Sequence, residues 1–286
     1  MRMRTLAPII LFVYDNPCHT EQTLEALSKN DLADQSTLYV VCDGYKKNES
    51  EEVIKNIRSV REICKKKQWA KEVIISEKET NEGKASSIIN GVTRILEKYG
   101  NIIVLEDDLI TSPGFLTYMN DALDLYASDE KVMHISSYWF PIKKSIQLLP
   151  EIFFCRFATS HGWATWKRAW AKLETDAYHL KKEIGYLSDG IKKFNIENSY
   201  PYLNQLEYNV IGKINTWAIK WYASIFLNNG LCLHPNISLV NKGMNTADSP
   251  ALSGIRVDKI SLEENITAVR LLKQLHKSIH RNFIDE

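Results

Sequence analysis

The chain has 286 residues, of which 44% are hydrophobic and 25% are charged, a composition typical of a soluble globular protein with a substantial core. Its net charge of +1 provides no broad positive surface, so we expect no nucleic acid among its partners. The five cysteines form no Cys-x-x-Cys pair, which predicts a reducing compartment and no structural zinc. The apolar run from Leu6 to Val13 is too short for a signal peptide or a membrane span, and we predict a cytoplasmic protein.

The first 110 residues alternate short apolar runs with amphipathic stretches. The runs predict buried strands, and the stretches between them predict helices with one apolar face. This alternation is typical of right-handed crossovers and a parallel sheet. We expect Thr20 to cap the first helix, and Asn48 with Glu51 to form a capping box for the second. The predicted strands cover residues 9–14, 37–42, 72–75 and 101–105.

Polar side chains follow three of these strands at the point where each strand ends. They are Asp15 with Asn16, then Asp43, then the triplet Glu106, Asp107 and Asp108. Because open α/β sheets bind ligands outside the carboxyl ends of their strands, we expect these side chains to share one site. Three adjacent carboxylates repel one another, so a cation is expected between them, and hard divalent ions prefer oxygen ligands. A single Asp after a strand is usually a turn or cap residue, but three strand ends in succession exceed that expectation.

The turn at residues 79–84 carries neither familiar phosphate-binding motif. The chain has no Gly-x-x-x-x-Gly-Lys-Ser/Thr and no Gly-x-Gly-x-x-Gly, which disfavours a P-loop kinase and a Rossmann dehydrogenase. Gly83 at a helix start could still let a phosphate or a base approach the backbone. An ordinary turn before a helix fits the local sequence equally well.

The second half of the chain is rich in tryptophan. After a predicted helix over 115–126 and a strand over 132–137, three Trp residues fall within eight positions around Gly162. Such density is typical of a core or an interface, although beside a metal site it could form a flat wall for a sugar or a base. A helix is predicted over 216–227, and the strand-like run 231–240 contains a proline that places it at an edge or a bend.

Two segments near the C-terminus have distinct compositions. Residues 241–254 are rich in Gly, Asn, Ser and Pro, and this length predicts a lid loop. A final helix, capped by Ser261 and Glu264, follows. We expect it to pack on its own domain, with peripheral contact to the inner face of a membrane as the alternative because its polar face is basic. Its expected apolar face carries Ile266, Val269, Leu272, Leu275 and Ile279, and its expected polar face carries Lys273, His276, Lys277 and Arg281.

Taken in order, these motifs resemble those of GT-A-fold glycosyltransferases, most closely bacterial surface-polysaccharide enzymes related to N-acetylglucosaminyltransferase I. In those enzymes a Glu-Asp-Asp triplet follows a buried strand and continues into a turn with Pro and an aromatic residue, as residues 104–115 do here. Segments 154–163 and 233–238 are similar to the family's Arg-Thr-Asp-Phe-Phe-Pro-Gly-Leu-Gly-Trp and Arg-Pro-Glu-Ile-Ser. The resemblance covers roughly residues 6–170 and 214–250.

The resemblance implies an α/β protein of the GT-A fold, with a Rossmann-like, mostly parallel central sheet flanked by helices. We expect a single domain over residues 1–286. Residues 1–140 would bind the nucleotide sugar, and residues 141–260, with the lid at 241–254, would form a smaller acceptor side. Residues 261–286 would form the C-terminal amphipathic helix.

The resemblance also implies roles for individual residues. Asp108 would ligate Mn²⁺ or Mg²⁺ on the donor diphosphate, Asp107 would contact the ribose or sugar, and Glu106 the transferred sugar. Asp43 would accept a hydrogen bond from uracil. Asn16 and Lys84 replace an Arg and a His of the family. Further donor contacts are expected from Tyr14, Asp15, Asn16, Asn81, Gly83 and Lys84, and a sugar or acceptor wall from His161, Gly162, Trp163 and Trp217.

The chain departs from the family at the catalytic base. The family has an Asp in a Trp-Asp-Asp-Trp segment, whereas Trp217-Ala-Ile-Lys-Trp221 places Ala218 at that position. Direct displacement at the anomeric carbon needs a general base near the acceptor hydroxyl. The candidates are Asp248 in the lid loop and Glu207 before the helix. A different approach of the acceptor, or a different stereochemical course, would also explain the change.

The sequence thus predicts a metal-dependent, inverting glycosyltransferase. It would move a sugar from a nucleotide diphosphate donor, expected to be a UDP-sugar, to a surface polysaccharide or lipid-linked glycan. A sugar-nucleotide nucleotidyltransferase is one alternative, although the Gly-rich loop that such an enzyme needs after its first strand is missing. The other alternative is a catalytically inactive relative that binds glycan or nucleotide, which Ala218 keeps open.

Overall fold

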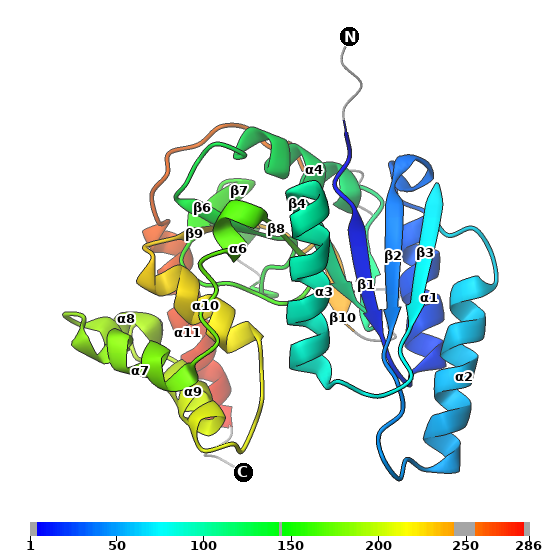
Figure 1. Ribbon diagram of the computed structural model, residues 1–286. Helices are drawn as coiled ribbons and strands as arrows, with labels where there is room; N and C mark the ends of the chain where they lie inside the picture. The colour runs from blue at the N-terminus through cyan, green and yellow to red at the C-terminus, as the bar shows by residue number, and fades with distance from the viewer. Residues whose placement is uncertain (1–4, 143–144, 243–254, 283–286) are drawn as a thin grey trace.

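The computed structural model describes residues 5–142, 145–242 and 255–282 (Figure 1). An eight-stranded sheet forms its centre, in the order β3-β2-β1-β4-β8-β6-β9-β7. β7 and β8 run opposite to the other six strands. The predicted α/β class with a mostly parallel central sheet flanked by helices is therefore confirmed.

The strands and helices have the following bounds. The central sheet contains β1 (Ile9–Val13), β2 (Thr37–Cys42), β3 (Glu72–Glu77), β4 (Asn101–Glu106), β6 (Val132–Ser136), β7 (Ile152–Cys155), β8 (Trp163–Trp166) and β9 (Leu231–Pro235). A two-stranded antiparallel sheet pairs β5 (Leu109–Thr111) with β10 (Val240–Lys242). The helices are α1 (Pro17–Ser28), η1 (Ala33–Gln35), α2 (Glu51–Lys65), α3 (Lys84–Tyr99), α4 (Phe115–Leu125), α5 (Ser145–Leu148), α6 (Lys167–Trp170), α7 (Ala177–Tyr186), α8 (Gly190–Phe194), α9 (Tyr202–Val210), α10 (Ala218–Leu227) and α11 (Ile266–Asn282).

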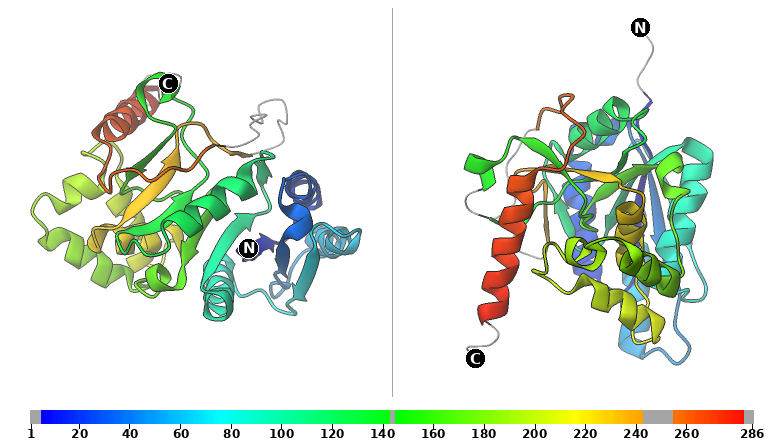
Figure 2. Two further views of the ribbon diagram at one scale, coloured as in Figure 1. Left: turned by 90° about the horizontal axis from the view of Figure 1, so that it is seen from above. Right: turned by 90° about the vertical axis from the view of Figure 1, so that its left-hand side faces the viewer.

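Helices cover both faces of the sheet, and the strand residues alternate between them. In β1, Ile9 and Leu11 pack into one core with α1, α2 and α4. Ile10 and Phe12 pack into a second core with α3, α6 and α10 on the other face. Figure 1 and Figure 2 show α3 separated from α1 and α2 by the strands. Because both faces are covered, the strands read as continuous apolar runs rather than as an alternating pattern.

A third core lies beside β7 and β9. There α7, α9, α10 and α11 pack around aromatic side chains that include Phe153, Phe194 and Tyr222. Figure 2 shows α11 alongside the shorter helices of this layer. No helix in residues 5–142, 145–242 or 255–282 is long and apolar enough to cross a membrane. The five cysteines are all free.

The predicted helix caps are wrong. The side chains of Asn16, Ser50 and Asn265 accept the capping hydrogen bonds at the starts of α1, α2 and α11. The expected caps were Thr20, Asn48 with Glu51, and Ser261 with Glu264. Thr20 is buried inside α1, and Asn48 has a φ of 66°, which is incompatible with the extended backbone of a helix cap.

The buried face of the C-terminal helix only partly matches the predicted one, in which Leu272 is buried and Val269 packs on the third core as expected. Ala268, Leu271 and Leu272 are buried, and His276, which we assigned to the polar face, is only 4% exposed. Ile266, assigned to the apolar face, is 57% exposed. The inward position of the histidine is explained by Ser199, whose hydroxyl lies 3.2 Å from the His276 Nδ1.

The first two residues of the predicted lid loop lie in a strand. Asn241 and Lys242 belong to β10, because they pair with β5. Residues 243–254, including Asp248, lie outside the described residues. Pro235 ends β9, which lies between β6 and β7, so this proline marks a bend rather than a sheet edge.

Two buried histidines make the fold sensitive to pH. Burial is the main cause that lowers the pKa of His134 to about 3 and that of His234 to about 4. The unfolded chain takes up protons on both near pH 6.5, whereas the folded protein does not. Their contribution to stability is therefore complete above pH 6.5, and we predict that it falls by about 1.4 kcal/mol per pH unit for each histidine below that pH.

Urea unfolding at pH 6.5 and pH 5 measures this effect. The wild type should lose about 2 kcal/mol more than His134→Asn between these pH values, since the variant lacks one titrating group. His179→Asn, which changes an exposed histidine of α7, should behave as the wild type. Equal losses in the wild type and His134→Asn would contradict the prediction.

Candidate functional site

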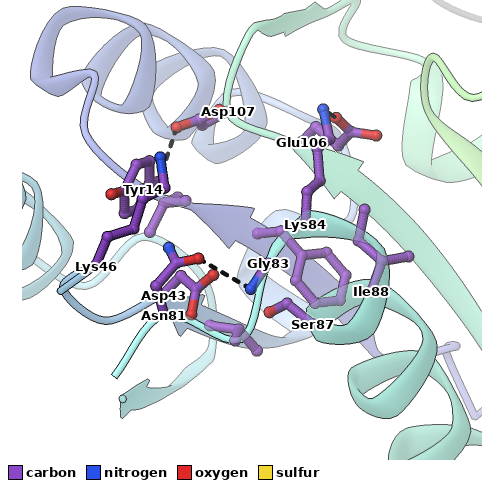
Figure 3. Close-up of a pocket in the computed structure, with 13 residues that line it drawn as sticks. Tyr14, Asp43, Lys46, Asn81, Gly83, Lys84, Ser87, Ile88, Glu106 and Asp107 are labelled. Atoms are coloured by element: carbon purple, nitrogen blue, oxygen red, sulfur yellow. Dashed lines mark hydrogen bonds and ion pairs between the residues drawn. The ribbon is translucent and has the colours of Figure 1, made fainter. Parts of the chain in front are cut away.

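A cavity of about 310 Å³ lies at the carboxyl ends of β1, β2 and β4 (Figure 3). The chain order reverses there, because β1 pairs with β2 on one side and with β4 on the other. Such switch points are where open α/β sheets bind ligands. The cavity is lined by the apolar side chains Phe12, Val13, Val41 and Ile88 and by Tyr14, Asp43, Lys46, Asn81, Gly83, Lys84, Ser87, Glu106 and Asp107.

Asp43 is held at the edge of this cavity by backbone amides. Its Oδ1 accepts hydrogen bonds from the amides of Gly44 at 2.9 Å and Glu82 at 3.2 Å. The turn containing Glu82 lies very close, because a Cβ on Gly44 would lie 2.4 Å from the backbone N and C atoms of Thr80. Asn81 joins the same turn to the cavity rim, since its Oδ1 accepts from the Gly83 amide at 2.9 Å (Figure 3).

The three carboxylates at the end of β4 point to different partners. Asp107 Oδ2 lies 3.3 Å from the Tyr14 amide and 3.4 Å from the Thr20 hydroxyl, both of which donate to it. Glu106 forms an ion pair with Lys84, and Asp108 Oδ2 lies 3.4 Å from Lys242 Nζ. The cation that the triplet requires is thus supplied, in this structure, by two lysine side chains.

Burial changes the acidity of this triplet. It is the largest cause that raises the pKa of Asp107 to about 6, and the neighbouring carboxylates add to it. Burial also raises the pKa of Glu106, against the attraction of Lys84. Both lysine side chains are largely exposed, by 71% for Lys84 and 61% for Lys242. The lysines can therefore move to an incoming anion.

A second cavity, of about 200 Å³, adjoins the first, because Lys84 and Glu106 line both. Ala218 lies on its wall, at the position where the resemblance places the catalytic base. Burial lowers the pKa of His161, another lining residue, so its imidazole is neutral at pH 7. The remaining lining residues are Ala85, Asp108, Ser160, Asn215, Thr216, Trp217 and Lys242.

The protein side chains at this site can hold a divalent ion only if a substrate supplies further ligands. Among the residues that the structure describes, no three His, Cys, Asp or Glu side chains converge to hold a metal. Asp108, with 27% of its side chain exposed, is the carboxylate that faces only the second cavity. Mg²⁺ is often bound by one or two carboxylates plus substrate phosphates, and Asp108 suits an ion held in that way.

The structure brings most of the predicted site residues together. Asp15 and Asn16 do not line either cavity, and the Asn16 side chain is occupied by the amide of His19. Glu207 lines neither cavity and pairs instead with Lys181. The predicted residues on the first cavity are Tyr14, Asp43, Asn81, Gly83, Lys84, Glu106 and Asp107, and those on the second are Asp108, His161 and Trp217, together with Ala218.

The predicted wall of His161, Gly162, Trp163 and Trp217 is only partly open: His161 and Trp217 line the second cavity, but Trp163 does not. Trp163 is fully buried and stacks on Trp217, with ring centroids 5.0 Å apart. The reason is that β8 lies inside the sheet, between β4 and β6, where both faces are covered. Gly162 has a φ of 65° and a Cβ there would lie 2.6 Å from the Ser137 hydroxyl, so this glycine lets the chain enter β8.

Two lysines of the site were not predicted. Lys46 lies on the first cavity, with its Nζ 5.1 Å from the centre of the Tyr14 ring. Its position shortly after Asp43 was a local signal that could have found it. Lys242 reaches Asp108 because β10 pairs with β5, with Lys242 opposite Leu109. That pairing joins distant parts of the chain and leaves no local pattern in the sequence.

The GNT-I family model matches residues 6–179, which is more than half of the chain. The chain belongs to the GNT-I family. The predicted resemblance to glycosyltransferases related to N-acetylglucosaminyltransferase I is thereby confirmed. No curated protein matches the sequence.

Several solved structures are similar to this chain at low sequence identity. The 1–349 fragment of S. aureus TarS shares 10% identity over 82% of this chain and 60% of its own, with a TM-score of 0.42. An active-site mutant of LgtC shares 8% identity over 76% and 70%, with a TM-score of 0.37. Glucosyl-3-phosphoglycerate synthase from Mycobacterium tuberculosis, in complex with Mn²⁺, UDP and glucosyl-3-phosphoglycerate, shares 12% over 59% of each chain, with a TM-score of 0.33. In a larger S. aureus TarS structure, the match spans 21% of that chain.

The close approach at Gly44 can be tested by substitution. Gly44→Ala should lower the unfolding free energy by about 1–3 kcal/mol, because the new Cβ forces the two loops apart. Gly185→Ala is the matched control, since a Cβ at this position in α7 meets nothing within 4 Å and alanine favours a helix. Urea unfolding measures both. A Gly44→Ala protein as stable as the wild type would mean that the loops are not locked together.

Proposed function

We propose that the protein transfers a sugar from a UDP-sugar to a surface polysaccharide or lipid-linked glycan, with the help of a divalent metal ion. The observation that carries this proposal is the pair of adjoining cavities that share Lys84 and Glu106. The first cavity has an apolar lining beside the carboxylate of Asp43. The second is lined by Asp108, Lys84 and Lys242 together with Ala218. Membership of the GNT-I family supports the same conclusion.

The first cavity suits the nucleoside of the donor. Its apolar lining would pack on the uracil ring, and the carboxylate of Asp43 would accept a hydrogen bond from the uracil N3–H. Asp107 would accept from a ribose hydroxyl. Because Asp43 is already fixed by two backbone amides, little conformational freedom would be lost on binding.

The second cavity suits the diphosphate and the transferred sugar. Asp108 would hold the metal ion, which when bound neutralises charge that develops on the leaving diphosphate. Lys84 and Lys242, whose side chains are largely exposed, would turn from Glu106 and Asp108 toward the phosphates. Glu106 would then be free to accept a hydrogen bond from the transferred sugar.

Neither of the two carboxylates predicted as the proton acceptor for an inverting displacement is among the described residues that line the second cavity. Glu207 is turned away in its ion pair with Lys181, and Asp248 lies outside the described residues, where its role stays a prediction. Apart from the carboxylates assigned to the donor, His161 is the described side chain of the second cavity that can take up a proton. We therefore place the base at its imidazole, next to Ala218.

Donor turnover tests the proposal. With Mn²⁺, the purified protein should release UDP slowly from at least one UDP-sugar. Asp108→Asn should reduce this release at least about a hundredfold, because it removes the carboxylate that holds the ion. Asp34→Asn, an exposed aspartate of η1, is the matched control and should keep full release. A panel of UDP-sugars with no release and no metal dependence would contradict the proposal.

An inactive relative that binds the nucleotide is the second candidate, because Ala218 occupies the expected base position. UDP binding with Mn²⁺, measured by calorimetry, separates the two. Asp43→Ala should weaken UDP binding by about tenfold in either case, since one hydrogen bond to a charged group is lost. Tight binding without turnover of any donor would favour the inactive relative. Pyrophosphate formation from a nucleoside triphosphate and a sugar phosphate would instead indicate a nucleotidyltransferase.

A further inference from the structure

A third cavity, of about 390 Å³, lies beyond the second and is lined mainly by aromatic side chains. We refer to it as the aromatic cleft. We propose that it binds a neutral pyranose ring of the acceptor glycan, an inference that rests on the proposed function. Its lining residues are Phe140, Phe157, Ala158, Thr159, Ser160, His161, Tyr200, Tyr202, Gln205, Ala218, Ile219, Tyr222 and His276.

The aromatic cleft is continuous with the donor site. It shares Ser160, His161 and Ala218 with the second cavity, which in turn shares Lys84 and Glu106 with the first. The three cavities therefore form one row, from the strand ends of β1 and β2 to the helices α9 and α10. A sugar bound in the aromatic cleft would approach the transferred sugar at Ala218, on the side opposite the nucleotide.

The aromatic rings of the cleft hold one another in place. The ring centroids of Tyr200 and Tyr202 lie 4.5 Å apart, and those of Phe157 and Tyr202 lie 5.2 Å apart. The fully buried Tyr222 supports Tyr202 edge-on, at 5.7 Å and an angle of 78°. Tyr200 and Phe140 are half-buried, so parts of their rings remain open. Packing thus provides a preorganised surface, which lowers the entropic cost of binding.

The chemistry of the lining fits a neutral sugar. A pyranose presents an apolar face of C–H groups, which stacks on aromatic rings, and a rim of hydroxyl groups, which need polar partners. Thr159, Ser160 and Gln205 supply such partners. No Asp, Glu, Lys or Arg side chain occurs among the described lining residues. The phosphates of a lipid carrier would meet no Lys or Arg here, so the occupant we assign is the sugar and not the carrier.

Substitutions in the full chain separate the aromatic cleft from the donor site. Tyr200→Ala removes part of the stacking surface, and Gln205→Ala removes a polar group. Tyr200→Phe keeps the ring, and Tyr186→Ala changes a tyrosine of α7 that is 71% exposed and lines no described cavity. The probes are the methyl glycosides of glucose, galactose, mannose, rhamnose, N-acetylglucosamine and N-acetylgalactosamine.

Three measurements are made on each protein. The first is the affinity for UDP with Mn²⁺, and the second is saturation transfer in NMR from the protein to each glycoside. The third is the release of UDP from a UDP-sugar, with and without the glycoside. In the wild type we expect at least one glycoside to receive saturation and to raise UDP release. Tyr200→Ala and Gln205→Ala should lower both effects at least tenfold, with UDP affinity within twofold of the wild type. Tyr200→Phe and Tyr186→Ala should retain them.

The possible failures are distinct. Glycoside binding that survives both Tyr200→Ala and Gln205→Ala would overturn the assignment of the aromatic cleft. So would a wild type that binds UDP but none of the six glycosides. A wild type that binds no UDP with Mn²⁺ would instead overturn the proposed function and the acceptor role with it.

Discussion

Three adjacent carboxylates are partly buried at the end of β4, and each has its own partner. Lysines from two distant parts of the chain pair with Glu106 and Asp108, and the Tyr14 amide and the Thr20 hydroxyl donate to Asp107. A buried charge without a partner costs several kcal/mol, and three like charges in a row would add mutual repulsion. Lys84 comes from the start of α3 and Lys242 from β10, so one ion pair joins α3 to the end of β4 and the other joins β10 to the turn after β4. Lys84 and Glu106 line both of the first two cavities, and Asp108 and Lys242 line the second, so the geometry of the site depends on this balance of charge.

This arrangement also explains how Lys84 and Lys242 could exchange their carboxylate partners for the phosphates of a donor. The side chains of Glu106 and Asp108 are shielded, being 13% and 27% exposed, whereas those of Lys84 and Lys242 are largely exposed. A diphosphate entering with a divalent ion would bring both charges that such an exchange needs. Lys242 and Lys84 would turn to the phosphates, and Asp108 would then hold the ion.

Much of the proposed donor site could be predicted from the sequence. β1, β2 and β4 are buried on both faces, so they appear as apolar runs that end abruptly at Asp or Glu, and parallel strands bring those ends together. Lys242 could not be predicted, since only the pairing of β10 with β5 places it beside Asp108. The helix caps were mispredicted because several Ser, Thr and Asn residues near each start compete for the same backbone amides.

The aromatic residues show why the proposed acceptor site was harder to predict. A dense group of tryptophans suggested a sugar-binding wall, but Trp163 lies in a strand flanked on both sides and is core. The open aromatic surface comes instead from Tyr200 and Phe140, which lie in segments without clear periodicity. The local sequence pattern indicates how apolar a segment is, but the burial of that segment depends on which elements pack against it.

The most direct test of the account is a crystal structure of the protein with UDP and Mn²⁺, with the ion located by its anomalous scattering. The account predicts the uracil in the first cavity beside Asp43, and the ion between the diphosphate and Asp108. It also predicts that Lys84 and Lys242 have turned to the phosphates. UDP bound elsewhere on the chain, or an ion without contact to Asp108, would contradict the assignment of the strand ends as a donor site.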